Sequence, residues 1–184
     1  MSRHLILLLL GLLAAQHAHA QMTVMSCNYD SGMVVISKTR WDETGSDFII
    51  RKTASPLPRC VFTQQPGDIR IPESEKIGND WYYIGFQQGK LLLDAGTANT
   101  GRELIVIDAA TGKTLRNIPS LESPTVEGNF AIITDETEIP ASKKQCPEVA
   151  AKYLPNTIIA IEKKVDLTTF KITPTQKRRC VYME

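Results

Sequence analysis

Short runs of hydrophobic residues, often alternating with polar ones, follow one another along most of this chain and are separated by Gly, Pro, Asn and Asp. Runs of this length that are rich in β-branched and aromatic residues are typical of β-strands joined by turns. Where a short Gly-containing segment separates two such runs, the pattern predicts a β-hairpin. The predicted hairpins pair residues 33–38 with 48–52, 81–86 with 90–94, 103–107 with 113–118, and 124–127 with 130–135.

The remaining predicted elements are a few further strands and one helix. Pro147 and Glu148 in a first turn, with Pro155 beyond the end, predict a two-turn helix over residues 147–153. The predicted fold class is therefore all-β, built mainly from antiparallel hairpins in blade-like or sandwich-like sheets, with one short helix in the C-terminal half. Further strands are predicted at residues 157–166, 170–173 and 178–183, and a short one around 60–63.

The first 20 residues have a different pattern, which is typical of a secretory signal. Arg3 gives a basic start, residues 5–13 are almost continuously apolar, and Ala18 and Ala20 are small residues at the two positions that a signal peptidase reads. The apolar run is too short to cross a membrane, and no later segment approaches the ~18 apolar residues required. We therefore expect cleavage after Ala20 and a single secreted or periplasmic, mostly-β domain over residues 21–184, without a membrane span.

Removal of this signal changes the chemistry that is available. The chain has three histidines, and all of them, His4, His17 and His19, lie within the signal. Nucleophilic catalysis by Ser-His or Cys-His pairs needs an imidazole, and most zinc sites need imidazole or clustered thiolates. The chain also contains no motif for phosphate or dinucleotide binding. We therefore predict a protein that is not an enzyme and that has no cofactor or metal ion.

The balance of charges bears on the partner. Lys and Arg number 21 against 20 Asp and Glu, so that the loss of Arg3 leaves equal numbers of basic and acidic side chains. Domains that bind nucleic acids carry an excess of basic residues, often gathered on one face. The sequence therefore predicts that nucleic acid is not a partner.

The cysteines predict disulfide bonds. Cys27, Cys60, Cys146 and Cys180 are an even set without C-x-x-C spacing, which is typical of disulfides in an exported protein. Four cysteines allow three pairings, and we favour Cys27 with Cys60 and Cys146 with Cys180 because each pair encloses one end of the chain. Each would close a loop of about 33 or 34 residues and stabilise the fold by roughly 3 to 4 kcal/mol. Reactive thiols are the alternative.

One short pattern occurs twice along the chain. Residues 107–113 and 165–171 both place an apolar residue before an Asp, a Thr three residues after that Asp and a Lys five residues after it. An Asp side chain accepts hydrogen bonds from backbone N–H groups two or three residues further on, and Thr supports the same turn. The pattern predicts two hairpin turns of one kind, at Asp108 and Asp166. They are either a true internal repeat or two independent turns.

Residues 90–98 and 102–115, which read KLLLDAGTA and RELIVIDAATGKTL, resemble one blade of a bacterial β-propeller. A propeller closes with about four to eight blades of four strands each. With one clear blade, this chain is too short to close an ordinary propeller. The resemblance therefore implies a blade-like open sheet, or two stacked antiparallel sheets.

A second resemblance concerns function. The secretion signal, the paired cysteines, the ELIVIDAATGK segment of residues 103–113 and the disulfide-anchored helix resemble periplasmic immunity proteins that neutralise type VI secretion peptidoglycan amidases. The resemblance implies a non-catalytic inhibitor that inserts a polar loop into the cleft of a peptidoglycan hydrolase, an amidase or a lysozyme. The matching loop is GTANTG, residues 96–101, in which Thr97, Asn99 and Thr100 would contact the partner. After its helix this chain departs from that pattern and continues through a long β segment.

Two other interpretations remain open. The loop of residues 96–101 also has the composition of an ordinary surface connection. An alternative function is a non-catalytic envelope component that binds a ligand or scaffolds other proteins through aromatic residues of segment 81–86. Alternation places Trp81 and Tyr83 on one face of that strand and Tyr82 on the other, which favours packing in the core. The basic segments 163–164 and 177–179 are interpreted as charged strand edges that block aggregation.

Overall fold

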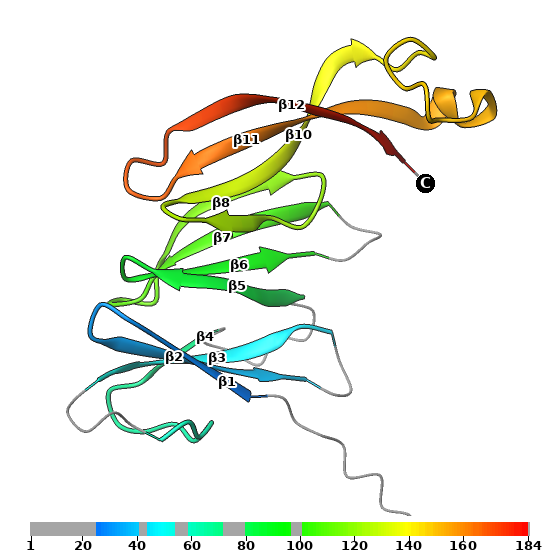
Figure 1. The fold of residues 1–184 in the computed structure, drawn as a ribbon. Coiled ribbons are helices and arrows are strands. Elements are labelled where there is room, and N and C mark those ends of the chain that lie inside the picture. The colour runs from blue at the N-terminus through cyan, green and yellow to red at the C-terminus, as the bar shows by residue number, and fades with distance from the viewer. Residues whose placement is uncertain (1–24, 41–43, 54–58, 72–79, 97–100, 184) are drawn as a thin grey trace, which may run out of the picture.

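The computed structural model describes residues 25–40, 44–53, 59–71, 80–96 and 101–183, which form three four-stranded antiparallel sheets stacked on one another (Figure 1). The predicted all-β fold of antiparallel hairpins is confirmed. Sheet 1 contains β1 (Met25–Asp30), β2 (Met33–Thr39), β3 (Ser46–Lys52) and β4 (Ile69–Ile71). Sheet 2 contains β5 (Trp81–Gln87), β6 (Lys90–Ala95), β7 (Arg102–Asp108) and β8 (Thr114–Ser120). Sheet 3 contains β9 (Thr125–Glu127), β10 (Phe130–Pro140), β11 (Thr157–Asp166) and β12 (Ile172–Tyr182).

Each sheet is a meander in which the strands pair in chain order. The four predicted hairpins are all present, as β2 with β3, β5 with β6, β7 with β8 and β9 with β10. Neighbouring strands of each sheet run in opposite directions. The turns that join the first strand to the second and the third strand to the fourth therefore lie at one end of the stack, which we call the turn end. The connections from second to third strand lie at the opposite end, which we call the loop end (Figure 1).

Two hydrophobic cores hold the sheets together, one in each space between neighbours. Successive side chains of a strand point to opposite faces, so β6 and β7 in the central sheet contribute to both cores. The core between sheets 1 and 2 includes Val35, Phe48, Leu91 and Ile107. The core between sheets 2 and 3 includes Leu92, Val106, Ile133 and Val165. The strands of the central sheet are therefore the most constrained part of the molecule.

The outer face of sheet 1 is covered by the chain itself. Val34, Ile36 and Ile49 form a third buried cluster there, and Phe62 packs against it. The Cys27–Cys60 disulfide, with its Cα atoms 5.8 Å apart, fastens the covering segment of residues 59–68 to β1. The segment runs over the face of the sheet, and its residues 60–63 do not form the short strand predicted there. Strand β4 follows it instead and pairs with β3.

One short helix in the C-terminal half is present, as predicted, but its bounds and its type differ from the two-turn helix expected over residues 147–153. Lys143 Nζ donates to the carbonyl oxygens of Pro147 (2.6 Å) and Val149 (2.8 Å), which are the groups that an α-helix would use for its own first bonds. A short 3-10 helix, η1 (Ala151–Asn156), forms instead and contains Pro155. The Cys146–Cys180 disulfide ties the segment before it to β12, so both disulfides follow the favoured pairing.

The two Asp-containing turns have the same geometry, as predicted. The Thr111 N–H donates to Asp108 Oδ1 and the Thr169 N–H to Asp166 Oδ1, each at 2.8 Å. Each turn also bonds to the first turn of its own sheet, from the Ala109 N–H to the Gly89 carbonyl oxygen and from the Leu167 N–H to the Asn129 carbonyl oxygen. The two turns occupy equivalent positions in sheets 2 and 3, which favours the internal repeat over two independent turns.

Sheet 3 extends further than its neighbours. Strands β10, β11 and β12 have 11, 10 and 11 residues, whereas those of sheet 2 have six or seven. Strand β12 also continues through residues 174–177, where a break was predicted. A register shift opposite Glu162 accommodates residues 175–177, while Pro174 stays paired with Lys163, because an edge strand tolerates proline. The ends of β10, β11 and β12 project beyond sheet 2 at the loop end, and we call this part of sheet 3 the overhang (Figure 1).

Candidate functional site

The loop predicted to bind a partner joins β6 to β7, the two central strands of the central sheet, at the loop end. Its predicted binding residues Thr97, Asn99 and Thr100 lie outside the described residues, so their role stays a prediction. The residues that flank them are described on both sides, and these show how the loop is supported.

Gly96 and Gly101 bring the two ends of the loop into contact. Gly96 has a φ angle of 111°, a value that L side chains rarely adopt, and its N–H donates to the Asp80 carbonyl oxygen at 3.0 Å. A Cβ atom at Gly96 would lie 2.5 Å from the Gly101 carbonyl oxygen. A Cβ atom at Gly101 would meet nothing within 4 Å. The close approach therefore requires glycine at position 96 but not at position 101.

An ion pair fixes the strands that carry these glycines. Arg102 Nη1 lies 2.5 Å from Asp94 Oδ2, and the Asp94 side chain is only 6% exposed. Burial raises the pKa of the Asp94 carboxyl, while Ser123 and Arg102 beside it oppose that rise. Removal of either charge would leave its partner buried without compensation, so the pair holds β6 and β7 together at the base of the loop.

A pocket of about 410 Å³ opens beside the base of the loop, and residues of sheets 2 and 3 line it. Arg102 and Glu103 line it from β7, and Asp135 lines it from β10. Lys163, 2.5 Å from Asp135, lowers the pKa of the Asp135 carboxyl and keeps it negatively charged at neutral pH. The pocket therefore offers charges of both signs directly next to the predicted binding loop.

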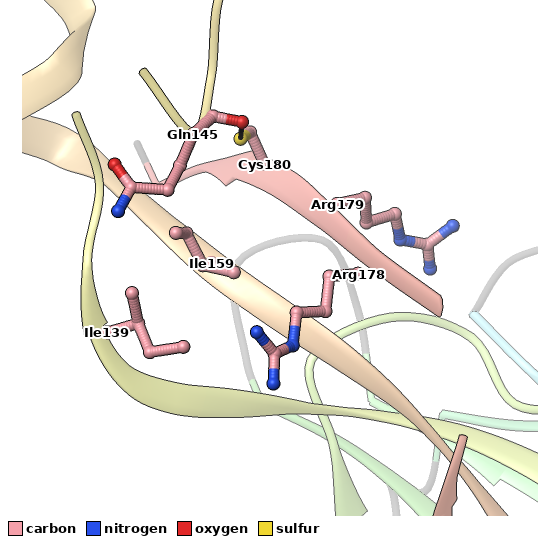
Figure 2. A pocket seen from close by; sticks show the side chains of 6 residues that line it. All are labelled: Ile139, Gln145, Ile159, Arg178, Arg179 and Cys180. Atoms are coloured by element: carbon pink, nitrogen blue, oxygen red, sulfur yellow. Dashed lines mark hydrogen bonds between the residues drawn. The ribbon is translucent and has the colours of Figure 1, made fainter. Parts of the chain in front are cut away.

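A second, smaller pocket of about 230 Å³ lies in the overhang. Ile139 and Ile159 form an apolar floor, and Gln145 and Cys180 lie at its back (Figure 2). Arg178 and Arg179 also line the pocket; the side chain of Arg178 lies on the side of the two isoleucines, whereas that of Arg179 points the other way (Figure 2). This pocket combines a small apolar surface with one exposed positive charge.

The two pockets open on the same face of sheet 3. Asp135 of the first pocket pairs across the strands with Ile161, and Ile161 pairs with Arg178 of the second pocket. Residues directly opposite each other in an antiparallel sheet share a face. The pocket at the base of the loop, the overhang and its smaller pocket therefore form one surface at the loop end.

Three aromatic residues of β5 lie in the core rather than on this surface. Trp81, Tyr83 and Phe86 pack against the core between sheets 1 and 2, and Ile84 packs against the other core. Alternation alone would send Phe86 to the face of Ile84, but a register shift between Tyr83 and Gly85 returns it to the face of Trp81. The structure therefore shows these side chains packed in the core, which is the interpretation that alternation favoured.

The sequence alone did not show the roles of Asp94, Asp135, Ile139 and Arg178. Asp94 and Arg102 are eight residues apart in sequence and lie on different strands, and their contact follows only from the register in which β6 pairs with β7. Arg178 was interpreted as part of a charged edge because nothing local shows which way it points. The one local signal in this region was the predicted pairing of Cys146 with Cys180.

The remaining chemistry of the described residues is limited. Residues 25–183, apart from the segments that the structure does not describe, contain no group of three or more His, Cys, Asp or Glu side chains that could hold a metal ion. None of the helices in this part of the chain is long and apolar enough to cross a membrane. Two disulfides fit a secreted or periplasmic protein, because such bonds persist in oxidising compartments. The predicted signal, residues 1–20, lies outside the described residues.

Comparison of this chain with protein-family models, with characterised proteins and with solved structures finds no match. The fold and the site define an all-β protein of three stacked meanders with a polar surface at one end of the stack. The function has to be argued from that surface.

Proposed function

We propose that this protein is a non-catalytic periplasmic inhibitor that blocks a cell-wall hydrolase, an amidase or a lysozyme, by inserting the loop of residues 96–101 into its cleft. The observation that carries the proposal is that contacts between described residues hold the two ends of this loop together. Gly96 contacts Gly101 above the buried Asp94–Arg102 pair, on strands that are packed on both faces. A loop that is fixed at both ends loses less conformational entropy on binding, which increases affinity.

The composition of the loop supports this use. Thr97, Asn99 and Thr100 carry two hydroxyl groups and one carboxamide, which can donate and accept hydrogen bonds in the polar cleft of a hydrolase. The pocket beside the loop adds Arg102 and Glu103 to the same surface. The proposed interface therefore combines the polar residues of this loop with the charged side chains beside its base.

The scaffold supports the proposal as well. All three sheets repeat one four-stranded meander, which is also the plan of a propeller blade, and the chain contains no histidine beyond residue 19. Without an imidazole, proton transfer near neutral pH would depend on carboxylates or lysines alone. A rigid stack of blade-like sheets that presents one loop suits recognition of another protein more than catalysis.

Inhibition assays test the proposal. The chain purified from the periplasm is titrated into a type VI peptidoglycan amidase and, separately, into a c-type lysozyme while hydrolysis of peptidoglycan is followed. We expect one of these activities to stop at equimolar inhibitor, and Thr97→Arg to weaken the inhibition by about 30-fold or more, as loss of an interface hot spot does.

The matched control is Thr114→Arg, which places the same side chain on an exposed residue at the turn end. This variant should inhibit as the wild-type protein does. The proposal is wrong if a large excess of the protein leaves both hydrolases active, or if the two arginine variants weaken inhibition equally.

A further inference from the structure

The smaller pocket, in the overhang, has a polar group that the rest of the fold does not use. Strands β11 and β12 carry five basic side chains, and four of them have a carboxylate partner. These pairs are Lys163–Asp135, Lys164–Glu127, Lys177–Glu162 and Arg179–Glu122. Arg178 is exposed, and its side chain has no hydrogen bond or ion pair with any residue that the structure describes. The positive charge of this strand edge is therefore concentrated at Arg178.

The surroundings of Arg178 are apolar and well held. Ile139 and Ile159 lie beside the Arg178 side chain, and Gln145 lines the same space (Figure 2). The Cys146–Cys180 disulfide fixes the back wall to β12. The bonds from Lys143 Nζ and the bond from the Cys146 N–H to the Ser142 carbonyl oxygen, 2.8 Å, hold the segment that carries Gln145. These bonds hold the wall of the pocket in place, and the pocket has an apolar floor and a positively charged rim.

The size of the pocket limits its ligand. Pockets that bury a whole small molecule are usually about 300 Å³ or larger, whereas this one is about 230 Å³. It suits a single aliphatic side chain with an adjoining carboxylate. Strand β12 is also the terminal strand of sheet 3, so its outer backbone groups are available to an extended segment that runs alongside it.

We infer that this pocket binds a carboxylate carried next to an aliphatic side chain on an extended segment of a partner protein. The aliphatic group would lie on Ile139 and Ile159, and the carboxylate would accept two hydrogen bonds from the Arg178 guanidinium, the arrangement that arginine favours. The inference goes beyond the proposed inhibition, because this pocket lies in sheet 3 and does not use the loop of residues 96–101. It holds for any protein partner with this chemistry.

Peptide titrations followed by NMR test the inference. The probes are acetyl-Ala-Glu-Leu-Ala-amide, which has a side-chain carboxylate, and acetyl-Ala-Ala-Leu with a free C-terminus. The neutral control is acetyl-Ala-Gln-Leu-Ala-amide. The signals followed are the methyl groups of Ile139 and Ile159 and the Nε–H of Arg178. We expect at least one acidic peptide to shift these signals with a Kd of about 1 mM, typical of so small a contact, and the neutral peptide to bind about tenfold more weakly.

Two charge variants complete the test. Arg178→Gln should weaken the binding of the acidic peptide about tenfold, while Lys177→Gln, which removes an exposed charge from the same strand outside the pocket lining, should leave it unchanged. Arg178 has no described partner to lose, so its variant should stay folded, and Ile139→Ala provides a second way to weaken the site. The inference is overturned if neither acidic peptide shifts the three signals, if the neutral peptide binds equally well, or if Arg178→Gln has no effect. Which acidic peptide binds shows whether the carboxylate is a side chain or a chain end.

Discussion

Arg51 and Asp68 show how single side chains hold the covering segment on sheet 1. Arg51 Nε lies 2.8 Å from Asp68 Oδ1 and Arg51 Nη2 lies 2.7 Å from Asp68 Oδ2, while the exposed fractions of the two side chains are 7% and 2%. Arg51 Nη2 also donates to the Thr63 carbonyl oxygen at 2.8 Å. One guanidinium therefore joins β3 to two points of the segment that covers the outer face of sheet 1.

Asp68→Asn should destabilise the protein by about 3 kcal/mol, because it leaves the Arg51 charge buried without its counter-charge. Urea denaturation measures this loss. Asp47→Asn is the matched control, since Arg40 and Asp47 form a more exposed pair, and it should cost less than about 1 kcal/mol. Equal losses in the two variants would show that burial does not strengthen the Arg51–Asp68 pair.

The same pair predicts how stability depends on pH. The hydrogen bonds from Arg51 lower the pKa of the Asp68 carboxyl below its value in the unfolded chain, which is about 3.9. The pair therefore stabilises the fold fully above that pH, and the contribution is lost as the pH falls through the lower, folded-state pKa. Between about pH 5 and 2 the wild-type protein should lose more stability than Asp68→Asn, and parallel pH profiles would contradict this account.

Gly96 and Gly101 offer a direct comparison at the base of the loop. Gly96→Ala should destabilise the protein by about 2 kcal/mol, because it combines an unfavourable φ with a clash against the Gly101 carbonyl oxygen. Gly101→Ala should be nearly neutral, since its Cβ would meet nothing nearby. Thermal unfolding of both variants measures the difference. Similar behaviour would mean that the loop is not pinned in the way described.

At the scale of elements, the two Asp-containing turns are the clearest repeated unit. Both place a residue with positive φ at the same position, Gly112 in one turn and Phe170 in the other. The backbone N–H groups of Thr169 and Thr168 lower the pKa of the Asp166 carboxyl, so the ionised form supports the turn. Its contribution is present above the unfolded-state pKa and is lost as the pH falls through the folded-state value.

Asp108→Ala and Asp166→Ala should destabilise the protein to similar extents, because the two carboxylates accept matching backbone hydrogen bonds. The double variant should show the sum of the two losses in urea denaturation, since the turns belong to different sheets. Thr114→Ala, beyond the first turn, is the control and should have little effect. A large effect in only one of the two Asp variants would contradict the equivalence of the turns.

Strands and turns could be predicted from sequence because their signals are local. The apolar run of residues 104–107 and the turn residues of 108–112 lie within one hairpin, and there the prediction and the structure agree. Strand β1 was missed because its residues are mostly polar or half-buried and their alternation is weak. The helix was misplaced because a side chain, Lys143, takes up the backbone carbonyl groups of the segment. The candidate surface depends on long-range register, which no local pattern contains.

At the scale of the whole molecule, the two disulfides hold different parts of the stack. Cys27–Cys60 fastens the segment that covers sheet 1, and Cys146–Cys180 fastens the segment behind the pocket of the overhang. Both close loops of similar length, with sequence separations of 33 and 34 residues, so chain entropy alone predicts similar losses of about 3 to 4 kcal/mol. The structural consequences should nevertheless differ.

Replacement of Cys27 and Cys60 by Ser should uncover the cluster of Val34, Ile36 and Ile49 and increase the binding of a hydrophobic dye. Replacement of Cys146 and Cys180 by Ser should leave dye binding low and speed amide exchange in residues 141–156 and in β12. Fluorescence and hydrogen exchange on the two double variants measure these effects. Uncovering of sheet 1 in the second variant would contradict the separate roles.

The central claim is that the loop end of the stack binds a cell-wall hydrolase. Hydrogen–deuterium exchange of the protein, free and mixed with the amidase or lysozyme that it inhibits, tests this most directly. We predict slower exchange at the loop end, in residues 94–96, 101–103 and 135–139, and unchanged exchange at the turn end, in residues 30–33, 88–90 and 109–112. Protection confined to the turn end, or no protection with either enzyme, would contradict the claim.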